Sequence, residues 1–292
     1  MRVLSLLLMI GLVLAPLRAT AGDPVKVVAS FSILGDMVRQ VTGDLAEVTT
    51  IVGPDADAHV YTPSTADAKS VAHAEIIFVN GLGFETWSQT LIETSGTKAE
   101  VFVATDGITP LMVDDEIDPH AWNSLKNGMH YVANIADSMA ETDPENAETY
   151  KANARAYTVR LMELHNHALA RFKRFPTDQC VVVTSHDAFG YLEADYGVTF
   201  LAPVGIDTEG EPSARDLAKL IDRLKLVGAG ALFVENITTP SLIQQIARET
   251  GIQMGGRLFS DALSERGGPA TSYEKMFEHN LQTLIEALNP QL

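Results

Sequence analysis

The sequence of 292 residues contains a single cysteine, Cys180. One cysteine excludes an intramolecular disulfide, although an exported protein would be free to form one. No cluster of thiolate or thioether side chains suggests a Cu(I) site either. Cys180 lies inside a short apolar run, so we interpret it as a packing residue and not as a reactive thiol.

Basic residues are also scarce. The chain has 21 Lys and Arg against 38 Asp and Glu, which gives a formal net charge of −17 at pH 7. A surface this acidic argues against nucleic acid and anionic membranes as partners. It is compatible with cations, but acidity alone does not indicate a cation site.

Long hydrophobic runs are absent except at the N-terminus. Arg2 precedes an apolar run from Val3 to Leu17, and small residues follow at Ala19 and Ala21. This pattern predicts a secretory signal peptide over residues 1–21, and the run is shorter than the ~20 apolar residues that a membrane anchor, the alternative, requires. We therefore expect a soluble protein exported to the periplasm, with 19 basic and 38 acidic residues and a net charge of −19.

Short runs rich in Val, Ile or Phe predict eight strands. The runs are VKVVASF from Val25, EVTTIV from Glu47, IIFVNG from Ile76, EVFVAT from Glu100, CVVVTSH from Cys180, TFLAPV from Thr199, ALFVEN from Ala231 and GIQMGGRLF from Gly251. Helical patterns alternate with these runs, as in ILGDMVRQV, SARDLAKLIDRLKLV and SYEKMFEHNLQTLIEAL. Alternation of strands and helices predicts an α/β fold with two lobes, each a roughly four-stranded parallel sheet with flanking helices.

One long segment separates the two sets of four strands. Asp143 followed by Pro144 is a good helix start, and apolar residues then recur three and four positions apart up to Ala168. About 30 helical residues at ~1.5 Å each make a rigid rod of roughly 45 Å, long enough to join two lobes. We predict a signal peptide at 1–21, an N-terminal lobe at 22–142, a linking helix at 143–174 and a C-terminal lobe at 175–292.

Four side chains follow predicted strands at the edge where parallel sheets bind ligands. They are His59, His120, His186 and Asp261, two from each lobe. If the lobes face each other, three imidazoles and one carboxylate meet in the cleft. This donor set is typical of four-coordinate Zn²⁺, whereas Ca²⁺ and Mg²⁺ prefer oxygen ligands. Four protein ligands leave no open coordination position, which favours holding a metal over using it in catalysis.

Each of these residues also has an ordinary interpretation, since a lone loop histidine is usually a surface or capping group. The other histidines lie within or at the ends of helical patterns, where packing or exposure explains them. Asp118 is a candidate cap for the helix after His120. Asp187 is either a helix cap or a hydrogen-bond acceptor that orients His186.

Five motifs complete the pattern. They are GPDADAHVYTPSTAD, DPHAW, SHDAFGYLEADYG, EPSARDLAKL and LFSDALSERGGPATSYEKMFEHNLQTLIEAL. With them the chain resembles the metal-binding components of zinc and manganese ABC importers, the cluster A-I substrate-binding proteins, over the whole predicted mature sequence. The resemblance implies two α/β lobes joined by a long helix, with metal ligands at His59, His120, His186 and Asp261. It also implies an ABC permease in the membrane as partner.

The resemblance further bears on the choice of metal. In manganese binders of the family a glutamate stands at the position of His186, so the imidazole here favours zinc. The chain looks most like zinc members, including the type paired with a separate periplasmic zinc metallochaperone. It departs from many of them in lacking a His-rich loop before His120, where MVDDEIDPH stands instead. The acidic residues Asp114–Glu116 either take over part of that role or form a solvated loop.

We therefore expect a monomeric protein that captures Zn²⁺ and delivers it to an ABC importer. A manganese-binding protein of the same family is the alternative. A less favoured one is an exported zinc hydrolase with Glu235 as general base, although no HExxH pair is present. A third alternative is a surface-interaction protein that uses zinc structurally, and such a protein would unfold without metal. We expect the metal-free protein to stay folded, because two lobes of over 100 residues each can hold their own cores. The rigid linking helix predicts metal release by local loop motion.

Overall fold

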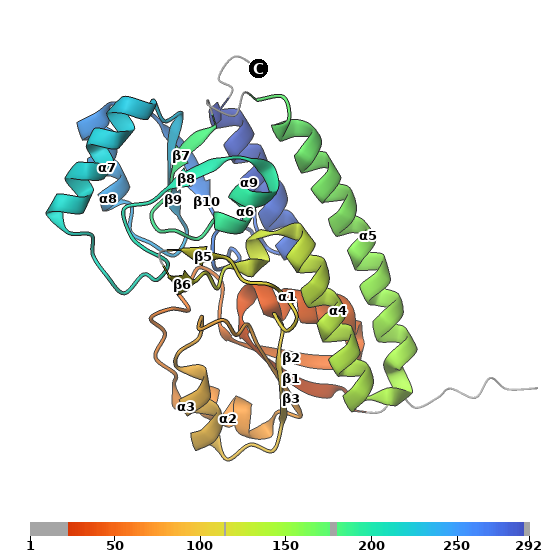
Figure 1. Ribbon diagram of the computed structural model, residues 1–292. Coiled ribbons are helices and arrows are strands. Elements are labelled where there is room, and N and C mark those ends of the chain that lie inside the picture. The colour runs from red at the N-terminus through yellow and green to blue at the C-terminus, as the bar shows by residue number, and fades with distance from the viewer. Residues whose placement is uncertain (1–22, 114, 176–179, 289–292) are drawn as a thin grey trace, which may run out of the picture.

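The N-terminal lobe is built on a parallel four-stranded sheet in the order β2-β1-β3-β4 (Figure 1). In this computed structural model, which describes residues 23–113, 115–175 and 180–288, the strands are β1 (Val25–Phe31), β2 (Ala46–Val52), β3 (Ile76–Val79) and β4 (Glu100–Val103). The inner strands β1 and β3 are apolar and almost wholly buried, as expected for a sheet covered on both faces. The helices of this lobe are α1 (Ser32–Thr42), α2 (Thr65–His73), α3 (Ser88–Ser95) and α4 (Leu125–Thr142).

The C-terminal lobe repeats this plan with the strand order β10-β9-β7-β8, again all parallel. Its strands are β7 (Val181–Val183), β8 (Thr199–Leu201), β9 (Ala231–Glu235) and β10 (Met254–Leu258). Its helices are α6 (Gly190–Tyr196), α7 (Ala214–Val227), α8 (Ser241–Thr250) and α9 (Tyr273–Leu288). The predicted α/β fold with two parallel four-stranded sheets is thus confirmed.

The side chains of the C-terminal sheet alternate between two cores. Val182 and Phe233 face the large core that continues into the N-terminal lobe, whereas Val183 and Leu232 face a smaller core under α7 and α8. This follows from the two-residue period of a strand. The large core contains residues of both sheets, so the two lobes are packed against each other and not merely tethered.

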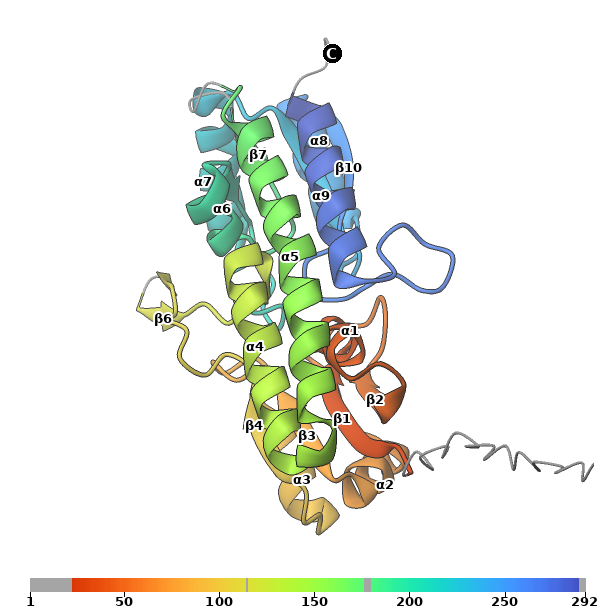
Figure 2. The same cartoon turned by 90° about the vertical axis from the view of Figure 1, so that its right-hand side faces the viewer.

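The linking helix runs along the back of both lobes, beside α4 and α9 (Figure 2). A short 3-10 turn (Pro144–Asn146) precedes α5 (Ala147–Phe172), so the helix is 26 residues long and shorter than predicted. The side chain of Asp143 makes no capping hydrogen bond to the backbone of this turn, and its carboxylate accepts hydrogen bonds from the side chains of Asn146 and Tyr150. The buried stripe of α5 includes His165, whose Nδ1 lies 2.9 Å from the Tyr196 hydroxyl oxygen.

Several predicted strands end earlier in the structure. The run from Cys180 to His186 forms only the three-residue strand β7, because its last residues turn toward the carboxylate of Glu235. Of the acidic segment before His120, Asp115 lies in the turn and Glu116 begins the short strand β6 (Glu116–Ile117), which pairs antiparallel with β5 (Met112–Val113). Asp115 and Glu116 are both exposed, as expected for a solvated segment, whereas Asp114 and the predicted signal peptide at 1–21 lie outside the described residues.

None of the described helices is long and apolar enough to cross a bilayer.

Candidate metal centre

His59 lies in the loop of residues 53–64, which connects β2 to α2 and is called the His59 loop below. The loop is held on the N-terminal lobe by the indole of Trp87, whose Nε1 donates to the Ala58 carbonyl at 2.8 Å. The backbone N–H of His59 donates to Asp57 Oδ1 at 2.9 Å, which orients the residue at the turn. The side chain of His59 is buried, and the edge of its ring meets Phe84.

His120 comes just before a 3-10 turn (Ala121–Asn123) that leads into α4. Asp118 Oδ1 accepts the backbone N–H of His120 at 2.9 Å and lies 2.8 Å from its Nδ1. Asp118 therefore orients the imidazole, and the interpretation of Asp118 as a helix cap is wrong. The cap of α4 is Ser124, whose hydroxyl accepts the N–H of Asn127.

His186 follows β7 and pairs with Val204 in an isolated parallel bridge. Glu235, at the end of β9, accepts the N–H groups of Ser185 and His186 on Oε1, while its Oε2 lies 2.6 Å from His186 Nδ1. Glu235 and not Asp187 is thus the carboxylate that orients His186. With both oxygens occupied and 1 % of its surface exposed, Glu235 has no room to act as a general base on a substrate.

Asp261 lies just after β10, in the segment that leads to α9, and is fully buried. Its Oδ2 is 3.3 Å from His59 Nε2 and 3.2 Å from His186 Nε2, and its Oδ1 is 3.8 Å from His120 Nε2. The carboxylate therefore faces all three imidazoles at once.

The four side chains converge at one point between the lobes. One ligand atom from each of His59, His120, His186 and Asp261 lies within 4.8 Å of every other. The Nε2 atoms of His59 and His120 are 3.2 Å apart. Ligand atoms around a tetrahedral ion with bonds of ~2.0 Å lie ~3.3 Å apart, so the spacing matches a four-coordinate metal site.

The charges of the four candidate ligands depend strongly on one another. Burial alone would lower the pKa of His186, but the carboxylates of Glu235 and Asp261 outweigh it and raise that pKa well above 6.5. Burial alone would raise the pKa of Asp261, but His186 and His120 hold it well below 3.8. A bound cation would take the place of the proton on His186.

Aromatic side chains enclose the cluster on its N-terminal side. The ring of Trp122 lies edge-on to His120, with ring centroids 5.3 Å apart, and Phe84 packs on Trp122. Trp122 Nε1 also donates to the carbonyl of Ser260 across the lobes, at 2.7 Å. These contacts bury the site and join it to the segment that carries Asp261.

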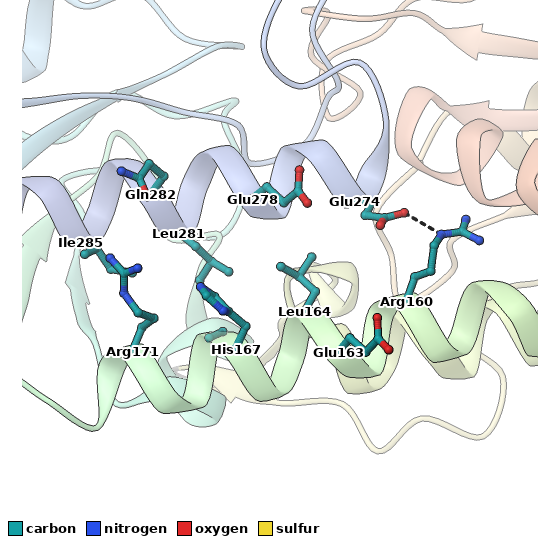
Figure 3. Close-up of a pocket in the computed structure, with 11 residues that line it drawn as sticks. Arg160, Glu163, Leu164, His167, Arg171, Glu274, Glu278, Leu281, Gln282 and Ile285 are labelled. Atoms are coloured by element: carbon teal, nitrogen blue, oxygen red, sulfur yellow. Dashed lines mark hydrogen bonds and ion pairs between the residues drawn. The ribbon is translucent and has the colours of Figure 1, made fainter.

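The remaining histidines have other partners. His73, His130 and His279 each place a ring nitrogen 2.7 to 3.0 Å from a backbone carbonyl, and His165 contacts Tyr196. His167 lines a groove of about 480 Å³ between α5 and α9, which contains none of the four candidate ligands (Figure 3). In this groove Arg160 Nε is paired with Glu274 Oε2 at 3.0 Å.

Two lobes of this topology around a buried cluster of three imidazoles and a carboxylate define a metal-binding protein. The profile of the family described as "Zinc-uptake complex component A periplasmic" matches residues 27–287, and the chain belongs to this family. It is accordingly a substrate-binding component of a metal ABC importer and not an enzyme. Such a component has a membrane permease as partner.

The relatives differ in the metal for which they are named. The manganese-binding lipoprotein MntA of Halalkalibacterium halodurans is 34% identical, over 92% of this chain and 90% of its own. The iron ABC transporter substrate-binding lipoprotein MtsA of Streptococcus pyogenes is 32% identical, over 98% and 96%. Among solved structures, the periplasmic zinc-binding protein TroA of Treponema pallidum has a TM-score of 0.87, with 27% identity over 91% and 99% of the chains.

Sequence reasoning missed the partners of the candidate ligands more than the ligands themselves. The sequence offers Asp118 as a helix cap and Glu235 as a general base, whereas in the structure they contact His120 and His186. For Glu235 the available signal was a carboxylate at the end of a buried apolar run, where an ionised group needs hydrogen-bond donors.

Proposed function

We propose that this protein captures Zn²⁺ with His59, His120, His186 and Asp261 and delivers it to the permease of an ABC importer outside the cytoplasm. The observation that carries the proposal is the convergence of three imidazoles and one carboxylate, all buried, within 4.8 Å. Imidazole nitrogen and carboxylate oxygen are ordinary zinc ligands, and four of them complete a tetrahedron.

The tautomers of two imidazoles support this assignment. Asp118 and Glu235 lie next to Nδ1 of His120 and His186, so a proton on each Nδ1 leaves the Nε2 lone pair for a metal. Carboxylates in these positions also raise the basicity of the ligand nitrogens, which strengthens their bonds to a cation.

Manganese is the second candidate, since a relative 34% identical is named for it. A site with three nitrogen donors favours zinc, because Mn²⁺ prefers oxygen ligands and forms weaker complexes with imidazole. We expect delivery by a monomeric protein in the periplasm. A periplasmic zinc metallochaperone is a further expected partner.

Titration of chelator-stripped protein with Zn²⁺, with Mn²⁺ as competitor, tests the proposal. We expect one tight zinc equivalent that excess manganese does not displace, and its loss or marked weakening in His186→Ala. His167→Ala, a histidine change in the groove behind the lobes, is the matched control and should bind zinc as the wild type does. Zinc binding that is equally tight in His186→Ala would disprove the assigned ligands. Displacement of zinc by manganese would show that manganese and not zinc is the substrate.

A further inference from the structure

The four candidate ligands are shut off from solvent, so metal exchange requires part of the protein to move. His120, His186 and Asp261 have no exposed surface, and His59 is 7 % exposed. Which segment opens depends on which contacts around the site are weakest.

The contacts between the lobes behind the site are buried. Trp122 Nε1 donates to the Ser260 carbonyl at 2.7 Å, the Tyr273 hydroxyl donates to the Trp122 carbonyl at 2.6 Å, and Asn123 Nδ2 donates to the Ala188 carbonyl at 2.9 Å. Opening the lobes widely would break these buried hydrogen bonds and expose a continuous apolar core to water. The His59 loop, by contrast, lies at the surface, with Pro54, Asp55 and Val60 exposed.

The His59 loop is fastened to the C-terminal lobe by one residue in particular. Asp55 donates its N–H to the Leu263 carbonyl at 2.8 Å. Its Oδ1 accepts from Asn236 Nδ2 at 2.9 Å, and its Oδ2 accepts the N–H of Glu265 at 3.1 Å. We call Asp55 with Asn236, Leu263 and Glu265 the interlobe clasp.

Two partners of the clasp, Leu263 and Glu265, lie in the segment that carries Asp261, and the third, Asn236, follows β9. Asn236 directly follows Glu235, the carboxylate that orients His186, and its Nδ2 also donates to the Ala262 carbonyl, next to Asp261. The side chain of Asn236 therefore connects the His59 loop to the segment of Asp261, and its neighbour Glu235 contacts His186. A second tie, a hydrogen bond outside the clasp, also fastens the His59 loop to the C-terminal lobe: the Thr208 hydroxyl donates to Asp57 Oδ2 at 2.6 Å.

The backbone of Asp55 is suited to this role. Its φ of 52° lies in the left-handed region, which Asp and Asn tolerate better than most residues other than glycine. This turn directs the N–H and both carboxylate oxygens of Asp55 toward the other lobe.

We propose that Asp55 is a positioning residue that holds the site closed and sets the lifetime of the bound metal. The inference rests on the proposed function, because the interlobe clasp can control metal release only if the four side chains hold a cation. The metal leaves when the clasp breaks and the His59 loop lifts away, while the lobes remain packed. Loss of the clasp then accelerates release.

Metal release from Asp55 variants tests the inference. Zinc-loaded protein is mixed with excess chelator and the release rate is recorded, beside the melting temperature of the metal-free protein. Asp55→Gly removes the carboxylate while keeping the positive φ accessible, and Asp55→Asn keeps one acceptor oxygen. Thr208→Val breaks the second tie without a change of charge. Asp137→Asn, at an exposed aspartate of α4, controls for the lost negative charge.

We expect Asp55→Gly to release zinc at least about tenfold faster, because two hydrogen bonds to a carboxylate are lost and solvent weakens both of them, with Asp55→Asn in between. Thr208→Val should also accelerate release, and Asp137→Asn should behave as the wild type. The melting temperature of metal-free Asp55→Gly should stay within a few degrees of the wild type, since the lobe contacts remain.

Equal release rates in Asp55→Gly and wild type would overturn the inference, and so would equal acceleration in Asp137→Asn. If the wild type holds manganese and not zinc, the same rates are read with manganese. A wild type that holds neither metal would overturn the proposed function and the clasp together.

Discussion

Replacing Glu235 by glutamine keeps the shape of a buried side chain and removes its charge. In the wild type, Oε1 accepts two backbone N–H groups, from Ser185 and His186, while Oε2 faces His186 Nδ1 at 2.6 Å. Glutamine has one acceptor oxygen, so it can serve the backbone groups or the imidazole but not both. Its amide N–H₂ would then face a donor.

The expected loss follows from this missing acceptor. Without a carboxylate at Nδ1, the tautomer that presents Nε2 to a cation loses its partner. Changes of such supporting groups typically weaken metal binding about 10- to 100-fold, or about 1.4 to 2.7 kcal/mol. We expect Glu235→Gln to bind zinc more weakly by this factor in a competition titration against a chelator of known affinity.

A matched control separates this effect from general destabilisation. Glu85 is also a buried carboxylate that accepts backbone N–H groups, from Asn80 and Gly81, but none of its hydrogen bonds involves the four candidate ligands. Glu85→Gln should lower the melting temperature and leave zinc affinity within about threefold of the wild type. A folded Glu235→Gln protein with unchanged zinc affinity would refute the reasoning.

Four further outcomes are expected. Because the raised pKa of His186 means that zinc displaces a proton, zinc affinity should fall as pH drops, and titrations in buffers of different ionisation enthalpy should detect the released proton. In the metal-free protein the stabilisation from protonated His186 is fully present below pH ~6.5 and is lost as pH rises through its raised pKa. Unfolding by urea should therefore require less denaturant toward alkaline pH. A midpoint that does not change with pH would contradict this. Removal of metal should leave the far-ultraviolet circular dichroism almost unchanged, because both cores are apolar and contain none of the four candidate ligands, and a lost helical signal would contradict this. Gly128→Ala should destabilise the protein by about 2 kcal/mol in urea unfolding, since the new Cβ would meet the Tyr273 hydroxyl at 2.3 Å, and wild-type stability would refute the clash.

Much of the fold could be predicted from the chain. Apolar runs bounded by turn residues indicate strands, and β1 has the limits expected for Val25 to Phe31. The alternation of strands with helices implied parallel sheets, whose carboxyl ends share one edge. This argument was sufficient to select His59, His120, His186 and Asp261, which the structure brings together.

The ends of elements were predicted less well because distant contacts decide them. The run after Cys180 leaves the sheet at Val183 since Ser185 and His186 donate to Glu235, 50 and 49 residues away. The linking helix begins at Ala147 and not at Pro144, because Asp143 bonds to side chains and a 3-10 turn intervenes.

By itself, the sequence determined the element order, the parallel sheets and the four side chains suited to a metal, since each of these depends on local pattern and residue chemistry. The tertiary structure alone decided which carboxylate serves which imidazole and how the lobes are fastened. Asp55 and Asn236 are 181 residues apart, and nothing in their neighbourhoods along the chain marks them as partners. Hydrogen bonds between such residues exist only after two lobes have packed at one relative position, and that position is set by the shared core and not by any local pattern.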